Sequence, residues 1–424
     1  MRIHPASSLL VAAVLACIPA QSARVADGMT WLPVVEIASG GGAKGPWRQN
    51  DSHYDYVDDG TAAFLPDGRL AVAWVDQRRK DVFLKVLDAD GRPRGAVVNV
   101  SRNPATFSWL PRIVAGGPDT LYVLWQEIIF SGGSHGGDVL FAHSTDGGRT
   151  FSQPRNLSTS RGGDGKGRLD RDTWSNGSLD LAAGPDGSVY AAWTEYDGML
   201  WLARSRDGGR SFSRPQLIAG DVKLPARGPS LAIGPAGRLY LAWAVGEDHD
   251  ADIRVSLSSD GGGTFAAPVL VGADQDRADM PRLVVDHKGA LHLAYLEQRG
   301  NSPARVRYVR ADPLGLRFGT PTTQSHDEGA AAVHLACGDD AHPRVLWEPA
   351  SRKGLWQSAT AGAGFSPHGL IPHSVPGGGG RNGSQQGILG QKLALHRDGT
   401  VAIVNSSLTP GHGSRVWLMR GRSR

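Results

Sequence analysis

The chain has 424 residues, of which 57 are glycine and 26 are proline; 40% are hydrophobic, and the formal net charge is +4. This is the composition of a globular protein, and so many turn-forming residues argue against a helical bundle and favour short strands joined by tight turns. Acidic and basic residues are interleaved without a block of Lys or Arg, which argues against a nucleic-acid partner.

The first 22 residues have the layout of a secretory signal peptide. A basic start precedes the apolar run 9–16, and small residues follow up to Ser22. We therefore expect export, as a secreted or periplasmic protein, with cleavage after Ser22 or one residue later. The residues that end at Cys17 also resemble a lipobox, so a lipid anchor on Cys17 stays open as an alternative.

The rest of the chain offers no second membrane segment and no disulfide. No later apolar run approaches the ~18 residues that a membrane-spanning helix needs. Cys337 would be the only cysteine of a chain that has lost Cys17, so the fold is expected to form without disulfides. A packing role for Cys337 is favoured over a nucleophilic one.

After residue 60 the sequence repeats with a period of about 50 residues, a spacing typical of propellers and other repeat architectures. Each copy has two apolar strands joined by a tight turn, and two further strands. The second strand ends in an aromatic residue at Trp74, Trp125, Trp193, Trp243, Tyr295 and Trp347. A seventh copy, 392–404, ends in Val404. The sequence therefore predicts an all-β fold: a β-propeller of four-stranded antiparallel blades, with seven blades preferred over six.

The seventh copy lacks a fourth strand of its own. Its last strand is expected over 414–420, whereas a spare apolar strand, 32–38, precedes the first copy. We expect the N-terminal segment 23–60 to supply this outer strand and to close the ring formed by residues 61–424. Closure would also protect a sheet edge from pairing with other chains.

Three turns share one pattern. The segments Ser144–Phe151, Ser205–Phe212 and Ser258–Phe265 each read Ser-x-Asp-Gly-Gly and end in Phe, and Ser358–Phe365 is a worn copy. The pattern resembles the Asp-box, or BNR, motif of the sialidase-like superfamily of propellers. Glycines take positive φ there, and the Ser and Asp side chains bind loop amides, as suits a hairpin between third and fourth strands. The resemblance implies that these turns lie opposite the active site, so they indicate a fold and not a reaction.

The other face is expected to carry the functional site, because the longest loops emerge there. The repeat aligns one polar residue at the start of each innermost strand: Thr61, Arg112, Asp180, Ser230, Arg282, His334 and Lys392. Further candidates lie just upstream: Asp58, Asp59, Trp109, Trp174, Arg227 and Asp279. Together they would form a charged funnel with aromatic walls, which suits a sugar acid or an oligosaccharide. A structural role, as the polar start of a strand, stays open for each of them.

A second set of acids lies two residues beyond the aromatic position, at Asp76, Glu127, Glu195 and Glu297. Because this acid recurs from blade to blade, a repeated structural task such as binding a loop amide is favoured over catalysis.

The segment 61–81 is similar to the first blade of sialidases. On that resemblance Arg78 would be an active-site arginine and Asp81 the acid/base carboxylate. The same alignment puts Asp58-Asp59-Gly60 where sialidases carry an arginine that binds the substrate carboxylate. Arg112 and Arg282 are candidates to rebuild part of that clamp from other blades.

The tyrosine nucleophile of sialidases has no single counterpart here. Tyr196 beside Glu195 and Tyr295 near Glu297 are candidates by residue type only, and Tyr54 and Tyr56 are equally open candidates. No pair of histidines has metal-ligand spacing, and the glycine run 376–380 is not followed by the Lys of a phosphate-binding loop. No metal or cofactor is therefore expected.

The primary hypothesis is an exported glycoside hydrolase that resembles exo-sialidases and acts on a glycan by general acid/base chemistry. Its catalytic candidates are Asp58, Asp59, Arg78 and Asp81. Its substrate-binding candidates are Arg112, Asp180, Arg227, Arg282, His334, Trp109 and Trp174. Two alternatives stay open: a non-catalytic propeller that binds a glycan or a protein, and a polysaccharide lyase with a Tyr or His base beside a charge-neutralising Arg.

Overall fold

The structure is a computed structural model that describes residues 28–423, apart from 47, 49–50, 132–133, 159–177, 196–197, 222, 247–250, 273–275, 313–314, 326–327, 339–341, 362–363 and 384–389. The expected signal peptide, Cys17, Trp174 and Tyr196 lie outside the described residues. Among the helices of the described part, none is long and apolar enough to cross a membrane.

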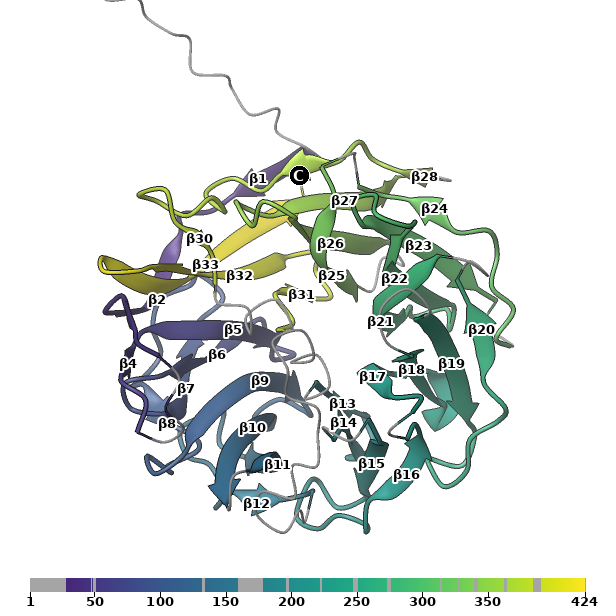
Figure 1. Cartoon of the computed structure of the whole chain (residues 1–424), viewed down its shortest axis with the longest axis horizontal. Helices are drawn as coiled ribbons and strands as arrows, with labels where there is room; N and C mark the ends of the chain where they lie inside the picture. The colour runs from purple at the N-terminus through teal and green to yellow at the C-terminus, as the bar shows by residue number, and fades with distance from the viewer. Residues whose placement is uncertain are drawn as a thin grey trace, which may run out of the picture.

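Seven antiparallel sheets stand as blades around one axis, which confirms the predicted propeller (Figure 1). Blade 1 consists of β5 (Val57–Phe64), β6 (Leu70–Asp76), β7 (Asp81–Leu87) and β8 (Val98–Asn99). Blade 2 consists of β9 (Phe107–Ala115), β10 (Leu121–Ser131), β11 (Ser134–Ser144) and β12 (Arg155–Asn156). Blade 3 consists of β13 (Leu179–Ala183), β14 (Val189–Thr194), β15 (Leu200–Ser205) and β16 (Gln216–Ala219).

The remaining blades follow in chain order around the ring. Blade 4 consists of β17 (Ala226–Ile233), β18 (Leu239–Val245), β19 (Asp252–Ser258) and β20 (Val269–Val271). Blade 5 consists of β21 (Arg277–Val285), β22 (Leu291–Gln298), β23 (Arg305–Ala311) and β24 (Thr322–Thr323). Blade 6 consists of β25 (Ala330–Cys337), β26 (Pro343–Pro349), β27 (Trp356–Ala361), β28 (Gly364–Phe365) and β29 (Gly369–Leu370). Blade 7 contains β30 (Arg381–Asn382), β31 (Leu393–Leu395), β32 (Val401–Thr409) and β33 (Gly413–Ser423).

The N-terminal segment closes the ring, as expected. Both β1 (Met29–Trp31) and β2 (Val35–Gly40) pair antiparallel with β33, with Val35 opposite Leu418. A short hairpin of β3 (Ala43–Lys44) and β4 (Tyr54–Asp55) then leads into blade 1. The first and last strands of the propeller therefore belong to one blade.

The hydrophobic core is divided into layers between neighbouring blades. The layer between blades 1 and 2, for example, contains Val75, Leu84, Val123 and Trp125, and the one between blades 5 and 6 contains Trp347. The aromatic residue of the repeat is deeply buried in these layers, because each blade presents an apolar face to each neighbour. Cys337 is a half-buried thiol at the end of β25.

Within each blade, the links between strands 1 and 2 and between strands 3 and 4 emerge on one face, which we call the turn face. The three Ser-x-Asp-Gly-Gly turns lie there. In the third, Ser258 Oγ accepts a hydrogen bond from the Gly262 amide (2.8 Å), and Asp260 Oδ1 accepts one from the Thr264 amide (2.9 Å). The other two turns repeat this pattern.

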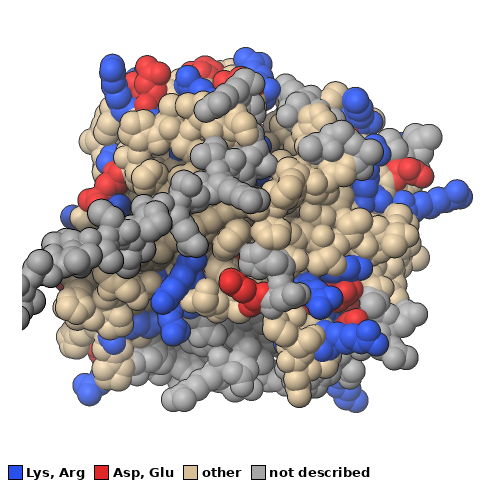
Figure 2. Space-filling model, turned by 90° about the horizontal axis from the view of Figure 1, so that it is seen from above, with Lys and Arg blue, Asp and Glu red and all other residues tan. Residues whose placement is uncertain are grey.

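Charged side chains of both signs lie on the outer edge of the ring. Figure 2 shows Lys and Arg next to Asp and Glu at several places along this edge. The unbalanced charges described below lie inside the ring.

Candidate functional site

The innermost strands share a bulge at their end on the face opposite the turns, which we call the loop face. The register with the second strand shifts at this point in blades 1, 2, 4 and 5. The bulge residue takes left-handed φ in all four: Asp59 (+54°), Leu110 (+52°), Gly228 (+60°) and Met280 (+54°). Three of these are not glycine, so the conformation is strained at the same position of three blades. Such strain is characteristic of functional sites.

Part of the polar column predicted from the repeat joins neighbouring blades. Asp180 Oδ2 accepts a hydrogen bond from the Leu231 amide of blade 4 (2.7 Å). Ser230 Oγ accepts one from the Leu283 amide of blade 5 (2.9 Å), and His334 Nδ1 accepts one from the Lys392 amide (3.4 Å). The structural role left open for the column is therefore real for these residues.

Six titratable residues form what we call the axial cluster: Asp59, Arg112, Asp180, Arg282, His334 and Lys392. Each lies close enough to others of the set to shift their pKa values. Arg112 Nε lies 3.7 Å from Asp180 Oδ1. The structure thus brings together Asp59 and five residues of the predicted polar column, from blades 1, 2, 3, 5, 6 and 7.

Two guanidinium groups from non-neighbouring blades contribute to this cluster. Burial and the charge of Arg282 lower the pKa of Arg112 to about 10, although Asp180 and Asp59 oppose this shift. Burial also lowers the pKa of Arg282, although Asp180 and Asp279 oppose this shift. Arg112 is buried, whereas Arg282 keeps some exposure to solvent. Asp180 therefore acts on both arginines and offsets part of their mutual repulsion.

Asp59 is a buried acid beside a second acid. Asp58 and Asp59 are each 1% exposed. Burial and the charge of Asp58 raise the pKa of Asp59 to about 8, although the Leu110 amide, Arg112 and Lys392 oppose this shift. Asp58 accepts a hydrogen bond from Ser406 Oγ, whereas Asp59 Oδ1 has no hydrogen-bond partner among the described residues. At neutral pH Asp59 is therefore a protonated carboxylic acid, the state that a general acid requires.

On the other side of the cluster, a buried ion pair fixes one charge. Lys392 Nζ donates hydrogen bonds to Glu348 and to Asn405 Oδ1 (3.0 Å), and all three side chains are buried. His334 is fully buried, and burial together with Arg282 and Lys392 lowers its pKa well below the usual value. A hydrogen bond with the Gln391 side chain opposes this shift, but the lowered pKa leaves His334 neutral at pH 7.

The two remaining described candidates at the start of the innermost strands do not face a ligand site. Arg227 donates to the Gly246 carbonyl (2.9 Å) and lies 3.4 Å from Asp279, which Arg277 also binds. Trp109 is 3% exposed and packs in an aromatic cluster with Phe107. Trp109 therefore packs inside the protein, and its role as an aromatic wall for substrate stays a prediction.

The structure separates Arg78 and Asp81 from the axial cluster. Arg78 is exposed and lines a different hollow of about 810 Å³, together with Tyr54 and Lys80. Asp81 is 3% exposed, and its oxygens accept hydrogen bonds from Ser101 Oγ, the Asn103 amide and Asn99 Nδ2. These bonds occupy the Asp81 carboxylate and assign it to holding the loop after β8.

The described tyrosine candidates are not activated. Burial and the charges of Asp58 and Asp59 raise the pKa of Tyr56 well above its usual value. Burial and Glu297 raise the pKa of Tyr295 to about 12, although Arg307 opposes this shift. A phenol with a raised pKa stays protonated and is a poor nucleophile.

The acids two residues beyond the aromatic position have the structural task that was expected. Trp125 Nε1 donates to Glu127 (3.1 Å), and Trp193 Nε1 donates to Glu195 (2.8 Å). Asp76 binds the loop amides of Arg78 and Arg79.

Sequence reasoning missed Glu348. It follows Trp347 directly, whereas the other acids come two residues after the aromatic position. Because side chains of a strand alternate between faces, this offset of one turns Glu348 to the opposite side from its counterparts. This offset is the sequence signal by which Glu348 could have been found.

The comparisons with known proteins agree on the fold. No protein-family profile and no curated protein matches this sequence. A protein of unknown function from Dyadobacter fermentans aligns with 94% of this chain and 100% of its own, with a TM-score of 0.54 and 14% identity. An α-L-arabinanase of Penicillium chrysogenum aligns with 73% of this chain and 92% of its own, with a TM-score of 0.52 and 15% identity. A polysaccharide lyase of family PL25, an ulvan lyase, aligns with 91% of this chain and 95% of its own, with a TM-score of 0.51 and 11% identity.

Proposed function

We propose that this chain is an exported carbohydrate-active enzyme, similar to sialidases, that binds an acidic glycan at the axial cluster and hydrolyses a glycosidic bond there. The observation that carries the proposal is that Arg112, of blade 2, lies 3.7 Å from Asp180 and close enough to Arg282, of blade 5, and to the raised-pKa Asp59 for each of them to shift its pKa. Paired arginines suit a carboxylate or a sulfate, and a raised aspartate pKa suits a proton donor.

Charges of both signs lie at the axis. Arg112, Arg282 and Lys392 are positive, whereas Asp58, Asp180 and Glu348 are negative. The support for an anionic ligand therefore comes from the two arginines and not from an excess of positive charge.

Asp59 is the proposed general acid. It would protonate the leaving oxygen while Arg112 and Arg282 hold the acidic group of the sugar. Asp180, 18% exposed and coupled to both arginines, is the proposed second carboxylate.

Three further observations support this class of protein. The Ser-x-Asp-Gly-Gly turns carry the hydrogen bonds expected of Asp-boxes, which favours membership of the sialidase-like superfamily. Two of the structurally similar proteins are named as an arabinanase and an ulvan lyase. The signal-like residues 1–22 favour a secreted or periplasmic location, with a lipid anchor at Cys17 as the alternative.

The test is hydrolysis by the mature protein, residues 23–424, of a panel of fluorogenic glycosides that includes sialosides and uronides. We expect turnover of an acidic substrate, and a loss of at least ~100-fold in Asp59→Asn and Arg282→Gln. Arg78→Gln is the matched control, because Arg78 lies in a different hollow, and it should retain activity. Full activity of both cluster variants would refute the proposal.

A lyase is the second candidate, and His334 is the observation that favours it. A lyase needs a neutral base beside an arginine that neutralises a uronate, and His334 is neutral and coupled to Arg282. Release of unsaturated sugars from polyuronates, measured by ultraviolet absorbance, would select this reaction. His334→Gln should then abolish the signal, whereas a hydrolase would give no absorbance change.

A further inference from the structure

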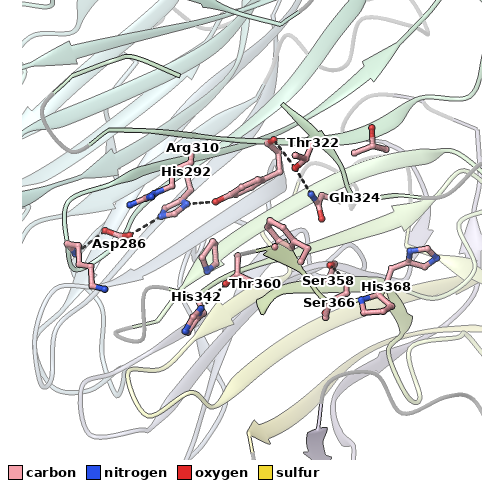
Figure 3. Close-up of a pocket in the computed structure, with 17 residues that line it drawn as sticks. Asp286, His292, Arg310, Thr322, Gln324, His342, Ser358, Thr360, Ser366 and His368 are labelled. Carbon is pink, nitrogen blue, oxygen red and sulfur yellow. Dashed lines mark hydrogen bonds and ion pairs between the residues drawn. The ribbon is translucent and has the colours of Figure 1, made fainter. Parts of the chain in front are cut away.

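A second hollow lies on the turn face between blades 5 and 6, far along the chain from the acids of blade 1. Its volume is about 850 Å³, within the range of sites for small organic ligands. Figure 3 shows Asp286, His292 and Arg310 of blade 5 on one side, and His342, Thr360 and Ser366 of blade 6 across from them. We call this hollow the blade 5–6 groove.

A shortened turn in blade 6 explains why the groove exists. In blade 4, Ser258 pairs with Leu239, four residues before Trp243. Thr360 has the corresponding place in blade 6, because Arg344 pairs with Ala359. The worn Asp-box therefore starts at Thr360, and the expectation that Ser358 holds the place of the first Ser is wrong. Two residues fewer precede Phe365 than precede Phe265 in blade 4.

The turn of blade 6 lies next to an arginine of blade 5. In blade 3, Arg204 lies opposite Tyr190 and donates to the Gly261 carbonyl in the turn of blade 4 (3.2 Å). Arg310 has the equivalent position in blade 5, opposite His292. Arg310 has no hydrogen-bond or ion-pair partner among the described residues, and its side chain is exposed at the groove.

Two cations lie among the described residues that line the groove. Lys288 and Arg310 line it, and neither side chain has an ion-pair partner in the described part of the chain. The carboxylate of Asp286 is already used, since it accepts hydrogen bonds from the Lys288 amide (2.9 Å) and the Ala290 amide (2.8 Å) and contacts His292 Nε2 (3.1 Å). An anionic ligand would meet two cations and no uncommitted acid from these residues.

One wall of the groove is rigid. His292 Nδ1 lies 2.6 Å from the Tyr308 hydroxyl, so a neutral His292 can donate to Asp286 and accept from Tyr308. Phe365 packs edge-on against Tyr308, with ring centroids 4.6 Å apart. His292 stands where blades 2, 3 and 4 carry a tyrosine, so this wall departs from the repeat.

Hydroxyl and amide groups of both blades also line the groove. Thr322, Gln324, Thr360 and Ser366 line the groove. Gln324 Nε2 donates to Thr322 Oγ1 (2.9 Å), which holds the Gln324 amide in place. Such groups, together with the apolar face of Phe365, match the mixed surface of a sugar ring.

We propose that the blade 5–6 groove is a second, non-catalytic binding site for an acidic saccharide. Lys288 and Arg310 would bind its carboxylate or sulfate, and the hydroxyl-rich wall would bind its ring. The choice of a saccharide among organic anions rests on the proposed function. Because the groove lies on the turn face and the axial cluster is reached from the loop face, one polymer chain would contact the two sites at different places.

The test is isothermal titration of the mature protein with a trigalacturonate, a sulfated disaccharide and their uncharged counterparts. We expect two sites for at least one acidic ligand in the wild type, and the better ligand identifies carboxylate or sulfate as the recognised group. Lys288→Gln/Arg310→Gln should weaken one site at least tenfold. The matched control is Arg206→Gln/Arg214→Gln, which removes two exposed charges from blade 3.

Arg282→Gln distinguishes this inference from the proposed function. If Arg282→Gln weakens only the site that the groove variant leaves intact, both the groove inference and the proposed function stand. If Arg282→Gln changes nothing while the groove variant loses a site, the groove stands and the axial proposal fails. Binding by the groove variant equal to the wild type, equal binding of the uncharged sugars, or no binding of either acidic ligand at millimolar concentration would overturn the inference.

Discussion

Aspartates at the two ends of the blades have opposite electrostatic environments. On the turn face, burial opposes the shift, but hydrogen bonds from Thr150 and Ser144 lower the pKa of Asp146 to about 2. At the axis, burial and Asp58 raise the pKa of Asp59 to about 8. The turn end stabilises its charge locally, whereas the axial end keeps an acid that is mainly protonated at neutral pH.

This difference indicates where the protein maintains unfavourable interactions. Left-handed φ angles at Asp59, Leu110 and Met280 accompany like charges at the axis, although Ala236, in a turn of blade 4, also has a left-handed φ. In the Ser-x-Asp-Gly-Gly turns, by contrast, the Ser and Asp side chains bind amides within a few residues. Local conflict that the rest of the fold tolerates is typical of functional sites. The comparison therefore makes distinct predictions for the two ends.

The largest expected effect is on catalysis at the axis. Asp59→Asn keeps an acceptor for the Leu110 amide and tolerates positive φ, but it removes the acidic proton. We expect kcat to fall ~100-fold or more on the substrate identified by the panel. Asp146→Asn, at the turn end, should leave kcat unchanged.

Asp59→Asn should also be more stable than the wild type at neutral pH. The folded pKa of Asp59 lies above its unfolded value, so the wild type loses stability as pH rises from about 4 to about 8. The melting temperature of Asp59→Asn relative to the wild type should increase over this window and then level off. A constant difference across the window would contradict the raised pKa.

Breaking the buried ion pair should have the next largest effect. Glu348→Gln leaves the Lys392 charge buried without a counter-ion, which we expect to cost about 3 kcal/mol in the free energy of unfolding. Urea denaturation measures this. Glu36→Gln, which removes an exposed acid from the closing strand β2, should cost less than about 1 kcal/mol. Equal effects of the two changes would show that Lys392 finds another partner.

Loss of a turn hydroxyl should have a smaller effect. Ser258→Ala removes the acceptor of the Gly262 amide, which is buried in the turn, and should cost about 1–2 kcal/mol in urea denaturation. Activity should not change, because the turn lies opposite the axial site. Ser259→Ala, one residue further on and exposed, is the control and should be neutral.

The smallest expected effect is a pH dependence at His334. Its folded pKa lies well below the unfolded one, so protons bind to the unfolded chain as pH falls below about 6.5 and stability is lost there. His334→Gln retains an acceptor for the Lys392 amide and should show a shallower loss. Thermal denaturation of the wild type and His334→Gln between pH 7 and pH 5 tests this. An equal fall in the melting temperature of both proteins would contradict the prediction.

The fold was predictable because a repeat carries the same information several times. The aromatic position, the tight turns and the spare strand 32–38 each indicate a closed propeller, and the structure confirms it. Residue type alone was a poorer guide to the site. Trp109 and Asp81 have the chemistry of site residues, but packing and hydrogen bonds that come from distant parts of the chain use them for structure.

The axial cluster was predicted in part. The column of polar residues placed Arg112, Asp180, Arg282 and His334 together, since equivalent strands meet at the axis. The pKa of Asp59 was not predictable, because it depends on burial by other blades and on the bulge that turns it inward. The blade 5–6 groove was equally hidden, since it results from a shortened turn whose register only the pairing of β26 with β27 reveals.

The pairing of β2 with β33 has a consequence for the order in which the molecule is assembled. Blades 1 to 6 are each made from consecutive strands, so each can form as soon as its own segment is available. Blade 7 requires Val35 to meet Leu418, and that contact has to wait until almost the whole polypeptide has been made. The ring would therefore stay open until the residues around Leu418 have been synthesised. A chain that terminates before them would never close its ring.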